Sequence, residues 1–90
     1  MTREAEPWTV YIIRASDDSL YTGITTDLAR RFQQHREGGG AKYFHAGRRP
    51  EQVVYQEVVQ DRGAASKREA VIKKLSREQK LILCRLDCER

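Results

Sequence analysis

The sequence has no long apolar segment and few cysteines, and each shortage excludes a class of protein. No stretch approaches the roughly 18–20 apolar residues of a membrane-spanning helix, and residues 1–7 contain no apolar core of a secretory signal. We therefore expect a cytoplasmic protein without membrane contact. The two cysteines, Cys84 and Cys88, lie four residues apart, which on a helix favours reduced thiols over a disulfide or metal site.

The 90 residues, 39% of them hydrophobic and 33% charged, suit one small globular domain. The net charge is +4, and it divides unevenly along the chain. Residues 1–45 carry six basic and six acidic side chains, so the whole surplus lies in residues 46–90. That surplus could form a basic face for a polyanion, or simply the solvated side of C-terminal helices. Charge alone does not decide between them.

The residue pattern predicts an α+β domain in the order ββα–loop–βαα. β-branched and aromatic residues predict three strands, over residues 8–14, 20–25 and 51–59. Periodicity predicts three helices, over residues 28–37, 62–75 and 76–86, with a glycine-rich basic loop after the first. Their starts are indicated by Thr25, Thr26 and Asp27 for the first, Asp61 for the second, and a capping-box signature of Ser76 and Gln79 for the third. We expect a small, mostly antiparallel three-stranded sheet flanked by helices, with a domain over 8–86, a flexible N-terminus (1–7) and a tail (87–90).

Two tyrosines lie on the first two strands, and the hairpin register decides whether they share a face. If Ala15–Ser19 is a five-residue loop, Tyr11 pairs with Gly23 and Ile13 with Tyr21, so both tyrosines and the glycine face the same way. A two- or four-residue loop would separate the tyrosines. Two strand tyrosines taken alone are more often structural.

The first predicted helix places an arginine and a histidine one turn apart. Leu28, Arg31, Phe32 and His35 share one helix face. If the two apolar residues face the sheet, Arg31 and His35 stand at the margin, where a guanidinium and an imidazole suit a phosphate. The alternative is an arginine that only extends to solvent and a histidine placed favourably near the helix C-terminus.

The second predicted helix has a carboxylate at the rim of its apolar face. Glu69 lies just outside the apolar arc, where a single carboxylate can bind Mg²⁺ while waters and substrate phosphates fill the other positions. Its alternative role is an ion pair with Lys73 at i+4. Arg68 falls inside the arc, and extension of its side chain to solvent is our only explanation.

These residues together resemble the signature of the GIY-YIG nuclease domain. Thr9-Val10-Tyr11 is followed ten residues later by Tyr21-Thr22-Gly23, and the match continues through Arg31 and His35 to Glu69. It covers Trp8 to Leu83 and is similar to the small stand-alone bacterial GIY-YIG proteins. Thr9, Val10 and Thr22 replace the usual signature residues. Many members carry an asparagine late in the domain, whereas this sequence contains none.

The resemblance implies a divalent-metal-dependent endonuclease or nickase that hydrolyses phosphodiester bonds, on branched, nicked or single-stranded DNA. Tyr21 would orient or deprotonate the attacking water, and Tyr11 would support it by hydrogen bonding. Arg31 would stabilise charge on the phosphoryl oxygens, and His35 would hydrogen-bond the phosphate or assist proton transfer. The metal, Mg²⁺ or Mn²⁺, would be held by Glu69.

The resemblance also implies that Gly23 lets the backbone approach closely. DNA is the expected partner, bound through its phosphate backbone, and a protein partner would supply specificity. The phosphate contacts are expected from Lys42, Arg48, Arg49, Lys67, Lys73 and Lys74.

Two other functions stay open at this stage. One is a nucleic-acid-binding module that kept the fold without efficient cleavage. The other is an adaptor whose basic helices bind an acidic protein. Tyr43-Phe44-His45, in the glycine-flanked loop, would serve any of the three functions by stacking on a base or packing on a protein.

Overall fold

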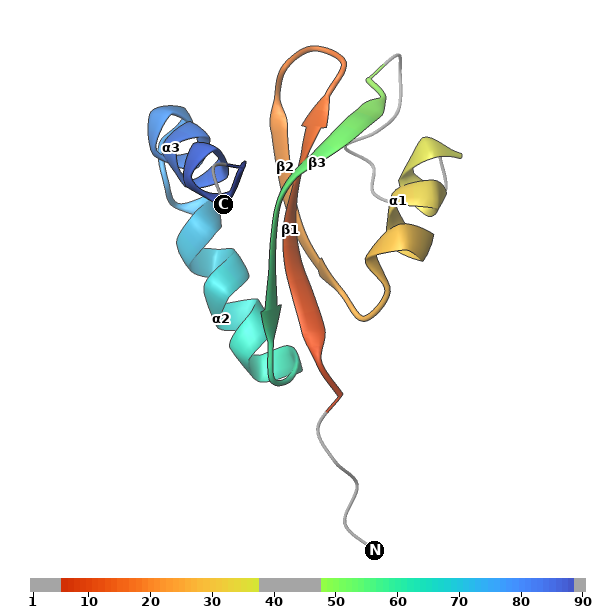
Figure 1. Cartoon of the computed structure of the whole chain (residues 1–90), viewed down its shortest axis with the longest axis vertical. Helices are drawn as coiled ribbons and strands as arrows, with labels where there is room; N and C mark the ends of the chain where they lie inside the picture. The colour runs from red at the N-terminus through yellow and green to blue at the C-terminus, as the bar shows by residue number, and fades with distance from the viewer. Residues whose placement is uncertain (1–5, 38–47, 89–90) are drawn as a thin grey trace, which may run out of the picture.

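The computed structural model describes residues 6–37 and 48–88. In chain order its elements are β1 (Trp8–Ala15), β2 (Leu20–Thr25), α1 (Leu28–Arg36), β3 (Pro50–Val59), α2 (Arg62–Lys73) and α3 (Arg77–Cys88) (Figure 1). The strands form one antiparallel sheet in the order β2-β1-β3. The predicted α+β class and element order are confirmed. The loop containing Lys42 and Tyr43-Phe44-His45, and most of the N-terminus predicted to be flexible, lie outside the described residues.

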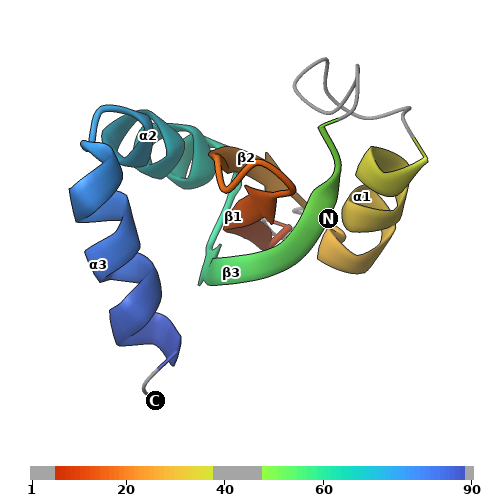
Figure 2. The same ribbon diagram turned by 90° about the horizontal axis from the view of Figure 1, so that it is seen from above.

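Helices cover both faces of the sheet. Helix α1 lies on one face, and α2 and α3 lie on the other (Figures 1 and 2). The central strand β1 is therefore enclosed on both sides, and four consecutive residues, Val10 to Ile13, are fully buried. Because side chains alternate along a strand, this single run supplies two separate cores.

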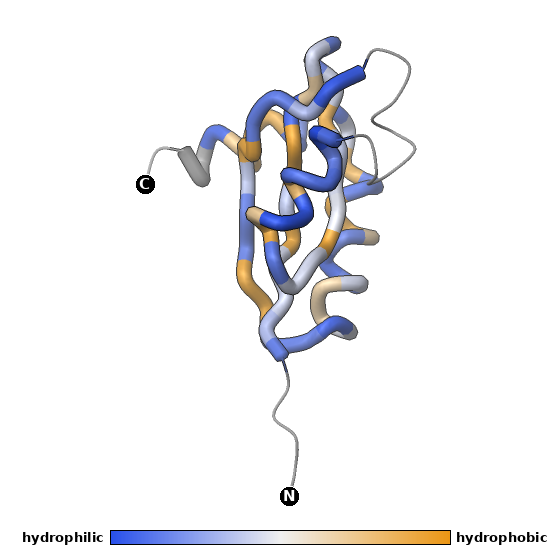
Figure 3. Tube along the Cα trace, turned by 90° about the vertical axis from the view of Figure 1, so that its right-hand side faces the viewer, coloured by the Kyte–Doolittle hydropathy of each residue, from blue (hydrophilic) through white to orange (hydrophobic). Residues whose placement is uncertain are grey.

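The two cores differ in composition. On the α2 and α3 face, Val10 and Ile12 pack with Ala65, Ile72 and Cys84. The other face has a buried cluster of Tyr11, Ile13 and Ala15, against which the partly buried Leu28 and Phe32 of α1 pack. Figure 3, in which α1 faces the viewer, shows that this helix is mostly hydrophilic, with hydrophobic segments in the strands behind it. Cys84 is buried and, among the described residues, forms no disulfide.

The hairpin adopts the register of the five-residue loop. Tyr11 pairs with Gly23 and Ile13 with Tyr21. The prediction that Tyr11, Tyr21 and Gly23 share a face is thus confirmed, and the face is the one that α1 covers.

The predicted caps position the three helices. The Asp27 and Asp61 side chains accept hydrogen bonds from the backbone N–H groups of Arg30 and Ala64, at the starts of α1 and α2. At the start of α3, the Ser76 hydroxyl accepts from the Gln79 N–H at 3.1 Å, and the Gln79 side chain accepts from the Ser76 N–H at 3.0 Å. This is the capping box that the sequence predicted.

Two boundaries and one side chain differ from expectation. Helix α2 ends at Lys73 rather than Leu75, because the chain tightens into a turn (Leu75 N–H to the Ile72 carbonyl, 3.0 Å) before the cap of α3. Helix α3 runs to Cys88, two residues past its predicted end. Arg68 does not simply extend to solvent: its Nε donates to Glu57 Oε1 at 2.8 Å. Within residues 6–37 and 48–88, no helix has the length and apolar character needed to cross a membrane.

Candidate active site

Three aromatic rings gather on the α1 face of the sheet. The Tyr11 hydroxyl lies 3.0 Å from His35 Nε2. The Tyr21 ring centroid is 5.3 Å from that of His35 and 6.3 Å from that of Tyr11. Tyr11 and His35 are buried, while Tyr21 is only partly so. The two signature tyrosines and the helix histidine therefore form one cluster, with Tyr21 nearest the solvent.

Gly23 makes room for this cluster. A Cβ atom at Gly23 would lie 2.5 Å from the Tyr11 hydroxyl and 2.7 Å from the ring carbon that bears it. No larger residue fits at this position unless the Tyr11 ring moves. Glycine is therefore needed because the β2 backbone passes close to the Tyr11 side chain.

Charge and burial set the protonation states of the buried pair. Burial raises the pKa of Tyr11 to about 12, against the opposing effect of a hydrogen bond with Arg31. Burial also lowers the pKa of His35 to about 4, and the nearby Arg31 charge adds to the effect. Both side chains are therefore neutral near pH 7. A guanidinium only donates, so the Tyr11 oxygen accepts from Arg31, while the direction of its hydrogen bond with His35 Nε2 follows the tautomer of the imidazole.

Arg31 stands at the rim of the cluster. It lies on α1 one turn before His35, is partly exposed, and donates from one terminal nitrogen to Gln34 Oε1 at 3.0 Å. Of the two residues predicted at the margin of the helix face, Arg31 lies there, whereas the prediction was wrong for His35, which packing against Tyr11 and Tyr21 buries completely. The neighbouring imidazole is fully enclosed, which leaves the guanidinium as the group that meets solvent.

Glu69 approaches the cluster from the other side of the sheet. It lies on α2, next to the edge strand β2, and in Figure 2 β2 lies between α2 and α1. The Glu69 charge is close enough to Tyr11 to raise the pKa of that phenol. Its side chain is 24% exposed and pairs with Lys73 Nζ at 3.4 Å. Tyr11, Tyr21, His35 and Arg31 thus gather on the α1 face of the sheet, while Glu69 acts on Tyr11 through its charge from α2, on the opposite face.

The donor set at this edge fits one kind of metal ion. Among the described residues, no group of three or more His, Cys, Asp and Glu side chains could hold a metal. A single carboxylate such as Glu69 is typical of Mg²⁺ sites in which waters and substrate phosphates complete the octahedron. The residues present therefore fit a hard divalent ion that arrives with its substrate.

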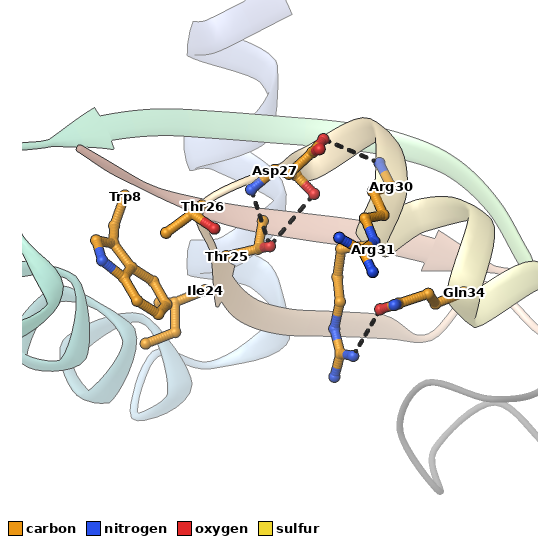
Figure 4. A pocket seen from close by; sticks show the side chains of 8 residues that line it. All are labelled: Trp8, Ile24, Thr25, Thr26, Asp27, Arg30, Arg31 and Gln34. Carbon is orange, nitrogen blue, oxygen red and sulfur yellow. Dashed lines mark hydrogen bonds between the residues drawn. The ribbon is translucent and has the colours of Figure 1, made fainter. Parts of the chain in front are cut away.

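A hollow adjoins the site where β2 turns into α1 (Figure 4). Its volume is about 280 Å³, and it is lined by Trp8, Ile24, Thr25, Thr26, Asp27, Arg30, Arg31 and Gln34. Of these, only Arg31 was a predicted site residue. For one of the others, Trp8, the hairpin register gave a sequence signal. Because Thr9 pairs with Thr25, Trp8, the chain's one tryptophan, lies beside the end of β2.

The residues expected to contact phosphates are spread over two regions. Arg48 and Arg49 lie at the hairpin end of the sheet, where Arg48 pairs with Asp17 at 2.9 Å and the Arg49 N–H donates to Ser16 Oγ at 3.1 Å. The other described ones lie on α2 or at its end: Lys67, Lys73 and Lys74 are all exposed.

The geometry agrees with what comparison with known proteins finds. Residues 7–81 match the model of the GIY-YIG catalytic domain, and the chain belongs to this nuclease domain family. Within it, the chain is similar to UPF0213 proteins: 52% identical to one from Haloquadratum walsbyi over 79% of each chain, and 46% identical to YhbQ of Escherichia coli over 82% of this chain and 73% of that protein.

Two solution NMR structures share the fold. The UPF0213 protein BH0048 of Bacillus halodurans matches with a TM-score of 0.57 and 40% identity, over 89% of this chain and 84% of that one. The protein EF2693 of E. faecalis matches with a TM-score of 0.62 and 34% identity, over 98% and 95% of the two chains. Family and fold are therefore established on both sequence and structure.

Proposed function

We propose that this protein is a divalent-metal-dependent endonuclease or nickase that hydrolyses phosphodiester bonds in DNA. The observation that carries the proposal is the cluster of Tyr11, Tyr21, His35 and Arg31 on the α1 face, with the charge of Glu69 acting on Tyr11 from α2. These are the positions at which the chain matches the motif of its family. A site at a strand edge is open to solvent, so a polymer such as DNA can reach it.

The two tyrosines have different roles in this proposal. Tyr11 is enclosed and its pKa is about 12, so it stays protonated, and its hydrogen bond fixes His35. Tyr21 is partly exposed beside the same imidazole. It is the phenol that can reach a water molecule at the edge of β2, and we assign to it the orientation of the attacking water.

Arg31 would act on the phosphate, and His35 would act on the two tyrosines. The guanidinium at the rim would bind the phosphoryl oxygens and stabilise the charge that builds up on them in the transition state. His35, with a pKa of about 4, is neutral, so it would serve as a hydrogen-bonding partner that orients the tyrosines. It would not be a general acid at neutral pH.

Glu69 would hold the Mg²⁺ or Mn²⁺ ion. When bound, the ion would polarise the phosphate and stabilise the leaving oxygen. Glu69 is engaged by Lys73 at 3.4 Å, so Lys73 must release the carboxylate or turn toward a phosphate when substrate arrives. Lys67, Lys74 and Arg49 would add contacts to the DNA backbone, and a protein partner would supply target choice.

The test is a cleavage assay on end-labelled nicked, branched and single-stranded DNA with Mg²⁺ or Mn²⁺. Wild-type protein is compared with Glu69→Gln and with a control, Glu78→Gln, which changes an exposed carboxylate on α3. We expect cleavage by wild type and Glu78→Gln, and loss of cleavage in Glu69→Gln.

Other outcomes would reject the proposal. Equal products from wild type and Glu69→Gln would identify a contaminating nuclease. Salt-sensitive DNA binding without products would make the protein a nucleic-acid-binding module, and absence of any binding would favour a protein adaptor.

A further inference from the structure

The hollow at the junction of β2 and α1 has two chemically different walls. One wall is apolar and consists of the Trp8 indole and Ile24. The other is polar and consists of Arg31 and Gln34, which hydrogen-bond to each other (Figure 4). Trp8 and Ile24 pack against the core of the α2 and α3 face, whereas Arg31 and Gln34 belong to α1, so the hollow extends around the end of β2. An aromatic side chain and a guanidinium in the lining of one hollow suit a nucleotide, since a base can stack on the indole while its phosphate meets the cation.

The charge around the hollow favours an anion. Arg30 and Arg31 line it, and the Arg62 guanidinium lies 5.7 Å from the centroid of the Trp8 ring. The one carboxylate in the lining is Asp27, and its Oδ1 already accepts the Arg30 N–H at 3.1 Å as the cap of α1. Within the lining, two guanidinium groups against one engaged carboxylate leave a positive balance at a site with an aromatic wall.

The position of the hollow relates it to the candidate active site. Arg31 belongs to both, because its guanidinium forms a wall of the hollow while its charge acts on Tyr11 and His35. A strand of DNA with one phosphate on Arg31 therefore places a neighbouring nucleotide over the hollow. Its volume of about 280 Å³ is at the small end for ligand sites, which suits one nucleotide rather than a larger molecule.

We propose that this hollow, which we call the Trp8 pocket, binds an unpaired nucleotide adjacent to the phosphate held by Arg31. Its base lies against Trp8 and Ile24, and its phosphate contacts Arg30. The inference rests on the proposed function, because it takes Arg31 as the ligand of the cleaved phosphate. A base inside a duplex is stacked and paired and cannot enter such a pocket, so the pocket selects DNA with an unpaired nucleotide beside the cleavage site.

Trp8 itself provides the readout, because it is the only tryptophan in the chain. Its fluorescence is measured while the protein is titrated with a short single-stranded oligothymidylate, in EDTA so that no cleavage occurs. We expect saturable quenching by the single strand, much less by the same sequence as a duplex, and none by inorganic phosphate alone. Binding of the labelled strand, seen by anisotropy, without a change in Trp8 fluorescence would overturn the proposal.

Variants separate stacking from general charge attraction. Trp8→Ala should weaken binding of the single strand by roughly five- to a hundredfold, whereas Trp8→Phe should keep most of the affinity. Arg30→Gln should weaken it more than Arg36→Gln, a matched control on the same helix that does not line the pocket. Equal losses in both arginine variants, or no loss in a folded Trp8→Ala, would contradict the pocket.

The fluorescence titration tests the Trp8 pocket and the cleavage assay tests the proposed nuclease, so either hypothesis can be rejected without the other. Cleavage by a protein whose Trp8 does not respond to single strands would reject the pocket and leave the proposed nuclease. A clear Trp8 response with no cleavage of any substrate would reject the nuclease and keep a pocket for unpaired nucleotides.

Discussion

The two faces of the sheet share one central strand but are built on different principles. On the α2 and α3 face, Val10 and Ile12 meet mainly aliphatic and small side chains, together with the Tyr55 ring. On the α1 face, Tyr11 meets an imidazole, a second phenol and the charge of Arg31. The first face gains stability from apolar burial. The second encloses polar groups, which burial destabilises unless they are hydrogen-bonded.

The difference suggests a division of labour within a very small domain. Buried polar groups need hydrogen-bond partners held in place. Apolar packing on the α2 and α3 face fixes β1, the strand that also carries Tyr11. Substitutions on the two faces should therefore affect different measurements, and the predictions below test that separation in order of expected size.

The largest effect is expected at Arg31. Arg31→Ala removes the cation at the rim, and loss of a group that stabilises transition-state charge typically lowers the rate by a hundredfold or more. Stability should change by less than about 1 kcal/mol, because the side chain is partly exposed. Cleavage rates and urea unfolding measure the two effects, with Arg36→Ala as the control on α1. Equal rates for the two variants would contradict a role for Arg31.

Ile72→Ala should show the opposite pattern. Ile72 is fully buried in the apolar core, and truncation of such a side chain costs about 2–5 kcal/mol of unfolding free energy. Below the melting temperature the cleavage rate of the folded protein should stay near that of wild type. A variant with full stability and lost activity would show that the faces are not separable in this way.

His35 should make stability depend on pH. Its pKa is about 4 in the folded protein against 6.5 ordinarily, so the unfolded chain binds an extra proton between these values. Stability should fall as the pH drops from about 6.5 to 4, by at most about 3 kcal/mol. Urea unfolding across this range, with His35→Gln as the reference, isolates the slope; identical slopes in both proteins would contradict a buried neutral histidine.

Gly23→Ala tests the fit between the edge strand and Tyr11. The new methyl group would lie 2.7 Å from a ring carbon as well as 2.5 Å from the hydroxyl. We expect a loss of about 1–3 kcal/mol in unfolding free energy from overpacking. Tyr11→Phe should not rescue it, because the ring carbon remains. Full stability of the single variant in thermal unfolding would show that the ring moves freely.

The smallest effect is expected at the exposed ion pair between Arg48 and Asp17. Arg48→Gln should change stability by less than about 1 kcal/mol, since exposed pairs contribute little. Hydrogen bonds with Ser19, together with Arg48, lower the pKa of Asp17 to about 2, so any acid-induced change from this group falls below pH 4, outside the range assigned to His35. A larger loss at neutral pH would mean that the hairpin turn depends on the pair.

Much of this arrangement could be predicted from local pattern. The order of the elements, the caps at Asp27, Asp61 and Ser76, and the shared face of Leu28, Arg31, Phe32 and His35 follow from spacing and from the few residues able to satisfy helix ends. Helix ends that depend on the start of the next helix could not be predicted as well. Helix α2 ends before its apolar pattern does, because the cap of α3 begins at Ser76.

Other features depend on residues far apart in the chain. Arg68 looked misplaced on an apolar face because its partner, Glu57, lies eleven residues earlier on β3. The hairpin register places Trp8 beside the end of β2, but the hollow that Trp8 lines forms only where β1, the end of β2 and α1 meet, so its lining could not be predicted from the sequence.

The sequence by itself determined the elements, the family and the candidate site residues. The tertiary structure decided which of those residues are enclosed and which meet solvent. Tyr11 and Tyr21 are equivalent as strand tyrosines, yet packing beneath α1 raises the pKa of Tyr11 to about 12, while Tyr21 stays partly exposed. Burial is a property of the assembled sheet and helices, so the division of roles between the two phenols arises only when both faces of β1 are covered.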